Sequence, residues 1–172
     1  MSSFTFYTAS ISEAAKALDA LTRILKKGQE ATNAATLPSA SIYEDMLPLT
    51  MQVSIACAHA NKLVSRTTGV EIPTQENNLR SFDDMHARIA QTQQLIAKAT
   101  MDVVNKSVNE ITAFPIGYNR TADLPIAALA TDYYLPNIFF HAITAYNILR
   151  KEGVPLGKAD YEDAFMALHM TQ

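Results

Sequence analysis

The residues best suited to chemistry in this 172-residue chain are two histidines and an asparagine in apolar surroundings. His141 follows Asn137 by four residues in the apolar stretch Leu135–Arg150, and residues four apart share one face of a helix. A helix that is apolar on nearly every side is normally buried, so the side chains of Asn137 and His141 are expected to point to the same part of the protein interior. His59 and Gln52 stand far earlier, in a helical stripe where hydrophobic residues are expected.

If His59 faces His141 inside the protein, the two imidazoles could do general acid and base chemistry, because the reference pKa of histidine is about 6.5. Structural interpretations of the same residues remain open. His59 could be a core histidine that hydrogen-bonds to Gln52 or Asn137, and Asn137 could simply cap a helix. The tyrosines near the apolar stretch are more often core residues than parts of a pocket, although Tyr134 could reach one.

The composition argues against several classes of function. The net charge is −3 and the Lys and Arg residues are scattered, whereas a nucleic-acid groove needs a concentrated basic surface. No basic amphipathic stretch favours a membrane surface, and no apolar run approaches the roughly 20 residues that span a bilayer. The glycine-rich patterns that bind phosphates are missing from the sequence. A small organic molecule or another protein chain remains as the expected partner.

Two features suggest the compartment. The single Cys57 cannot form an internal disulfide, which agrees with a reducing environment, and we expect it to be buried and inert. The N-terminal residues Met1–Tyr7 carry neither the basic nor the apolar segment of a secretory signal. We therefore expect a cytoplasmic protein.

Hydrophobic periodicity predicts four long helices. Their expected ranges are residues 10–28, 47–67, 81–105 and 127–151. The first should begin with a capping box between Ser10 and Glu13 and end at Gly28 in a left-handed conformation. The fourth should bend or restart at Pro136 and end at Gly153, because proline is costly in a helix interior.

The remaining segments complete the expected fold. Residues 110–116 favour a strand and residues 118–120 a turn, and residues 158–172 favour a short last helix. We predict an all-α protein, a four-helix bundle in one domain over residues 1–172, with a short β-hairpin or extended crossover between helices three and four. Seven methionines and the apolar fourth helix also predict a homodimer, because more apolar surface is available than one bundle covers.

Several segments carry a resemblance to a known family. They are Tyr43–Leu49, Gln52–Ala60, Gly69–Pro73, Arg88–Thr92, Tyr134–Asn137, His141–Arg150 and Gly153–Tyr161. With these segments the chain resembles the DinB/YfiT-like superfamily of four-helix-bundle metalloenzymes, in the branch numbered nineteen ninety-three among the domains of unknown function. The resemblance runs from about Tyr7 to Tyr161, and the Leu-Pro-Asn block of the fourth helix is its most specific part.

The resemblance implies an inner pocket and, as in better-known members, a divalent metal bound by three histidines. One of these comes from helix two, and a His-x-x-x-His pair comes from helix four. His59 matches the first ligand and His141 the second of the pair, whereas Asn137 replaces the other histidine. An Asn oxygen is a weak ligand for zinc, nickel or iron, so the metal is expected to be weakly held or absent. Some relatives are thiol-dependent transferases or hydrolases acting on small molecules.

The predicted function is therefore an enzyme that acts on a small organic molecule in a pocket between helices two and four. Gln52, Tyr134 and Asn137 are expected to line this pocket. His59 and His141 are the predicted catalytic residues, either as weak metal ligands together with Asn137 or as metal-free acid and base groups. The alternative is a non-catalytic dimeric binding or interaction protein that keeps the bundle and has lost the metal site.

Overall fold

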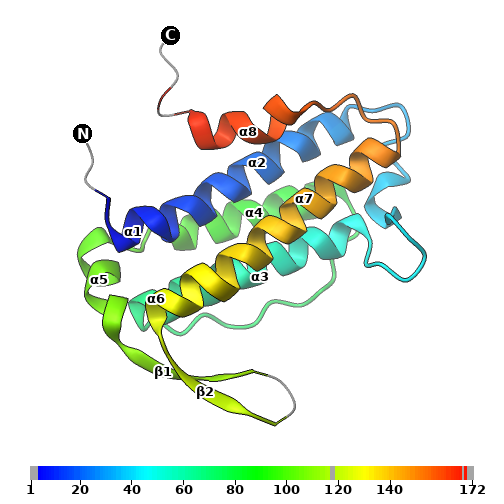
Figure 1. Cartoon of the computed structure of the whole chain (residues 1–172). Coiled ribbons are helices and arrows are strands. Elements are labelled where there is room, and N and C mark those ends of the chain that lie inside the picture. The colour runs from blue at the N-terminus through cyan, green and yellow to red at the C-terminus, as the bar shows by residue number, and fades with distance from the viewer. Residues whose placement is uncertain (1–3, 117–118, 168, 170–172) are drawn as a thin grey trace.

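Four long helices lie side by side and form the body of the protein (Figure 1). The fold is known from a computed structural model, which describes residues 4–116, 119–167 and 169. The long helices are α2 (Ile11–Gln29), α3 (Leu49–Thr68), α4 (Phe82–Ile96) and α7 (Leu135–Lys151). Helix α3 contacts α4 and α7, and α2 contacts the same two helices. The predicted all-α bundle is confirmed.

The apolar stripes of these helices meet in one core. Leucines and isoleucines of α2 and α7 are fully shielded from water, among them Leu18, Leu21, Ile138 and Ile148. Complete burial of such a side chain stabilises a fold by about 1.5–3 kcal/mol. The core therefore fixes how α3 and α7 face each other, and with them the two histidines.

The first predicted helix begins differently from our expectation. A one-turn helix, α1 (Phe6–Ala9), precedes α2, and its capping box joins Thr5 and Thr8. The predicted box between Ser10 and Glu13 is wrong, because Ser10 lies at the buried junction of the two helices and its hydroxyl donates to the Phe6 carbonyl at 2.6 Å.

Gly28 also has another role than predicted. It is a helical residue of α2, not a left-handed terminator, since the helix continues to Gln29. A Cβ at this position would lie 2.9 Å from Leu149 Cδ2 and 3.1 Å from Phe82 Cζ. The missing side chain thus allows α2 to approach α7 and α4 closely.

The third predicted helix is broken. Helix α4 ends at Ile96, and a separate helix α5 (Met101–Lys106) follows, continued by the 3-10 turn η2 (Ser107–Asn109). The prediction of one helix to residue 105 was wrong because no proline or glycine marks the break. Tertiary contacts decide it: the new direction buries Val104 and lets Asn105 Oδ1 accept the Tyr7 N–H at 2.8 Å.

A β-hairpin connects the third and fourth long helices, as expected. Strands β1 (Ile111–Pro115) and β2 (Thr121–Pro125) pair antiparallel, with Ile111 opposite Pro125 and Pro115 opposite Thr121. The hairpin projects from the bundle end near the start of α6 (Figure 1). The predicted turn at residues 118–120 lies partly outside the described residues, and Asn119 within it has φ +58°.

The fourth predicted helix is built from three parts. A short α6 (Ile126–Ala128) leads into a π-helix, η3 (Leu129–Tyr134), and α7 then starts with Pro136 in its first turn. Proline lacks an N–H and its ring collides with the carbonyl four residues earlier, so a wider turn before Pro136 relieves the conflict. Gly153 follows the helix end with φ +88°, and the predicted restart and end are both confirmed.

The remaining elements cover the bundle. A 3-10 turn, η1 (Leu37–Ser39), lies in the connection before α3. The last helix, predicted over residues 158–172, is α8 (Lys158–Met166), and residues 168 and 170–172 of that prediction lie outside the described residues. Helix α8 packs on α2, where Asp160 pairs with Lys27 at 2.6 Å. Among the described residues, no helix combines the length and the apolar character that a bilayer crossing requires.

Candidate functional site

His59 and His141 meet between α3 and α7. Their rings are nearly parallel, with an interplanar angle of 13° and centroids 6.2 Å apart. His59 is supplied by the middle of α3, and His141 by the second turn of α7. The contact between these two helices in the core thus brings together side chains that are 82 positions apart in the sequence.

Gln52 fixes the orientation of His141. Its Nε2 donates to the Leu47 carbonyl at 2.8 Å, which directs its Oε1 to His141 Nδ1 at 2.7 Å. An amide oxygen only accepts hydrogen bonds, so Nδ1 of His141 carries the hydrogen. In the neutral ring, Nε2 is then left with a free lone pair.

His59 is half-buried beside two tyrosines. Its ring centroid lies 5.5 Å from that of Tyr133, with the rings edge to face, and 6.1 Å from that of Tyr134. Nδ1 of His59 is buried, and within the described residues it has no hydrogen-bond partner. A buried N–H without a partner is rarer and costlier than a bare acceptor, so the hydrogen belongs on Nε2.

Both rings are neutral at pH 7. The pKa of His59 is lowered to about 4, mainly by burial and to a smaller extent by repulsion from His141 and from Lys62. Burial also lowers the pKa of His141. Besides the buried lone pair on His59 Nδ1, the pair therefore offers a lone pair on His141 Nε2 and an N–H donor on His59 Nε2.

Asn137 lies on the same face of α7 as His141, but its amide is used by the backbone. Nδ2 donates to the Tyr133 carbonyl at 2.7 Å, at the junction of the π-helix with α7. This contact fixes the side chain beside the widened turn.

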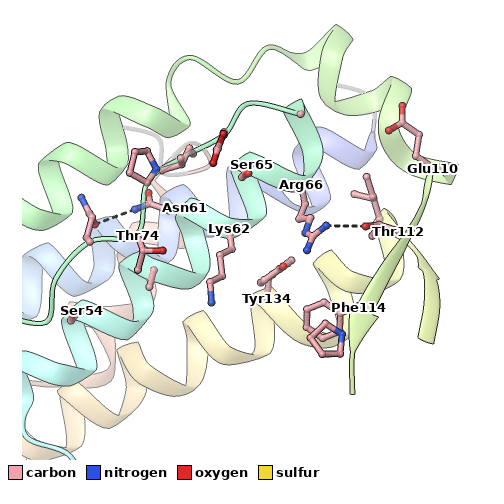
Figure 2. A pocket seen from close by; sticks show the side chains of 18 of the residues that line it. Ser54, Asn61, Lys62, Ser65, Arg66, Thr74, Glu110, Thr112, Phe114 and Tyr134 are labelled. Carbon is pink, nitrogen blue, oxygen red and sulfur yellow. Dashed lines mark hydrogen bonds between the residues drawn. The ribbon is translucent and has the colours of Figure 1, made fainter. Parts of the chain in front are cut away.

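A cavity of about 670 Å³, lined by both polar and apolar side chains, lies along α3 (Figure 2). Helix α3, the segment 69–75 and strand β1 form its walls. Of the residues predicted for a pocket, Tyr134 lines this cavity, whereas Gln52, Asn137 and the two histidines do not. Tyr134 is only 2% exposed and thus stands between the cavity and His59.

Comparisons with known proteins agree with this architecture. A family model described as a domain of unknown function, DUF1993, matches residues 6–162. The chain belongs to the DUF1993 family. It is also similar to the crystal structure of a DinB family member protein from Shewanella denitrificans, with a TM-score of 0.81 and 26% identity over 90% of each chain. None of the curated proteins matches this DUF1993 chain significantly.

The side chains of this DUF1993 protein do not fit a tightly held divalent metal. Within the part of the chain that the structure describes, no group of three or more His, Cys, Asp and Glu side chains could hold a metal ion. The available donors at the histidine pair are two neutral imidazoles and the Asn137 amide oxygen. This set contains no anionic ligand, and the amide is a weak ligand for zinc, nickel or iron.

The polar face of α3 in this DUF1993 protein was missed by the sequence reasoning. Ser54 and Asn61 are both buried and stand seven residues apart, which places them on one helix face. Arg88 of α4 is only 8% exposed and lines the same cavity. Polar residues repeating at helical spacing on a second face of α3 were the signal that could have revealed it.

Proposed function

We propose that the chain is an enzyme that moves protons on a small carbonyl compound, with His141 as the base and His59 as a neutral hydrogen-bond donor. The observation that carries this proposal is the hydrogen bond of 2.7 Å between Gln52 Oε1 and His141 Nδ1. It leaves His141 Nε2 as the acceptor, and Gln52 also stabilises the imidazolium that forms when Nε2 takes up a proton.

The proposed proton transfer involves only His141, His59 and the substrate. His141 Nε2 takes a proton from the carbon next to the carbonyl, and the C–H electron pair becomes the C=C bond of an enolate. The carbonyl oxygen gains the negative charge, and the Nε2–H of His59 donates a hydrogen bond to it. A neutral imidazole suits this task, because its pKa of about 4 keeps His59 uncharged throughout. Return of the proton from His141 completes the cycle without a metal.

Hydrogen–deuterium exchange tests the proposal. Small ketones, aldehydes and 2-oxo acids are incubated with the protein in D₂O, and loss of the C–H signal is followed by proton NMR. We expect faster exchange for some of these compounds, and a decrease of about 100-fold or more with His141→Gln. His86→Gln, on α4, is the matched control and should keep the wild-type rate. Exchange that is unaffected by His141→Gln, or not accelerated for any compound, would contradict the proposal.

A second candidate, a non-catalytic homodimer, is favoured by exposed apolar side chains on α7 and α8. Phe140 is 58% exposed, Ile143 44% and Met166 46%. Light scattering of the wild type and of Ile143→Lys tests it: a dimer that dissociates in the variant, together with no proton exchange in either protein, supports this function.

The buried lone Cys57 supports a reducing, cytoplasmic location for either candidate.

A further inference from the structure

We propose that the cavity between α3, segment 69–75 and β1 is a second binding site, for a small organic anion that also carries a hydrogen-bond donor. The two histidines do not line this cavity, and the inference does not depend on the function proposed above. Three observations carry the inference: a buried cation, a buried acceptor and the size and charge of the cavity.

Arg88 is the buried cation. The residue is only 8% exposed, and its guanidinium donates to the Glu76 carbonyl at 2.9 Å and to Asn78 Oδ1 and Ser54 Oγ at 3.5 Å. All three acceptors are neutral, and among the residues that the structure describes no carboxylate forms an ion pair with Arg88. A buried charge without a counter-charge is costly, so an anion in the cavity would compensate it.

Asn61 supplies the buried acceptor. The residue is 6% exposed, and its Nδ2 donates to Gln75 Oε1 at 3.2 Å (Figure 2). Its Oδ1 is buried, and in the described part of the chain it has no hydrogen-bond partner. A buried carbonyl of this kind gains free energy when a ligand hydroxyl or amine donates to it. The expected ligand therefore carries a donor as well as a negative charge.

The other side chains of the cavity also favour an anion. Lys62 and Arg66 of α3 also line the cavity. With Arg88 they make three cationic side chains in the lining, against two carboxylates, Glu71 and Glu110. Arg66 donates through Nη1 to Thr112 Oγ1 at 2.8 Å, which ties β1 to α3 and holds the guanidinium at the cavity (Figure 2). A net positive lining attracts anions over uncharged molecules.

The volume sets the size of the ligand. Sites for small molecules typically measure about 300–1,000 Å³, and this cavity measures about 670 Å³. Ile72, Phe114 and Ile126 provide apolar surface for a short carbon skeleton. A hydroxylated carboxylate and a small phosphate monoester share the required oxyanion and donor.

Four probes separate the two requirements. Glycerate and glycerol 3-phosphate carry both an oxyanion and hydroxyl donors, propionate carries only the oxyanion, and glycerol carries only the donors. Binding is measured by titration calorimetry and located by amide chemical shifts in proton–nitrogen NMR spectra. We expect glycerate or glycerol 3-phosphate to bind at least about tenfold more tightly than propionate and glycerol, with shifts at Ser54, Asn61 and Arg88. The better of the two tells whether a carboxylate or a phosphate is preferred.

Two variants assign the roles. Arg88→Gln should weaken glycerate and propionate by the same factor, of about tenfold or more, because it removes the shared anion contact. Asn61→Leu should abolish the preference for glycerate over propionate and leave propionate binding unchanged. If Arg88→Gln does not fold, substitution of the exposed residue Arg66 by Gln gives the same test. We expect this variant to lose several-fold in affinity for glycerate and propionate. No binding of any probe, equal binding of glycerol and glycerate, or shifts confined to Gln52 and His141 would overturn the proposal.

Discussion

Acidification tests the burial of the histidine pair, because the pKa of His59 is about 4 in the folded protein and near 6.5 in the unfolded chain. The cause is chiefly burial, followed by repulsion from His141 and Lys62. Between these two pH values the unfolded chain binds more protons than the folded protein. The stabilisation is therefore fully present above pH 6.5 and is lost as the pH falls through 4.

The magnitude follows from the difference between the two pKa values. At about 1.36 kcal/mol per pKa unit, a change from 6.5 to about 4 corresponds to about 3 kcal/mol. The ring is only half-buried, so solvent screening reduces this figure, and we expect about 1.5 kcal/mol. Most of this loss falls between pH 7 and pH 4.5.

Urea unfolding of the wild type and of His59→Gln at pH 7 and pH 4.5 measures this effect. Carboxylates titrate in both proteins, so the difference between their two pH-dependent losses isolates His59. We expect the wild type to lose about 1 kcal/mol more than the variant. Equal losses in the two proteins would refute the reasoning that the fold holds His59 neutral.

Three further predictions concern other contacts of the fold. Gln52→Leu removes the acceptor of the His141 Nδ1–H and should lower the free energy of unfolding at pH 7 by about 1–3 kcal/mol in urea titrations; an unchanged value would mean that the bond contributes nothing. Gly69→Ala should cost about 1 kcal/mol because the residue caps α3 with φ +71°, whereas Gly69→Asn, which tolerates this conformation, should cost less in thermal unfolding. Burial raises the pKa of the Cys57 thiol to about 12, so a disulfide reagent at pH 8 should label it only after denaturation, and rapid labelling of the native protein would show that the thiol is accessible.

The bundle could be predicted from the sequence because its signals are local. Apolar residues recur at helical spacing, and Gly153 and Pro136 mark boundaries that the structure confirms. The break between α4 and α5 could not be predicted, because contacts with α1, such as that of Asn105 with Tyr7, impose it without a breaking residue.

The candidate site could be predicted only in part. His59 and His141 can be predicted as site residues because histidines are unusual in apolar stripes, and Gln52 because it shares the stripe of His59. The role of Gln52 as the partner of His141 depends on a side-chain hydrogen bond that no spacing reveals. Nothing in the sequence shows that segment 69–78 folds over Arg88 and buries its charge.

The π-helix η3 determines where the hairpin stands. A π-helical turn holds more residues than an α-helical turn, and each residue of an α-helix turns the chain by about 100°. Deleting one residue between Leu129 and Tyr134 would restore regular winding and swing the preceding hairpin about the helix axis by roughly that angle. Thr112 would then move away from Arg66, and one wall of the cavity would open. Loss of a single amino acid, far from both the guanidinium and the imidazoles, would thus reshape this end of the molecule while the four long helices stay packed.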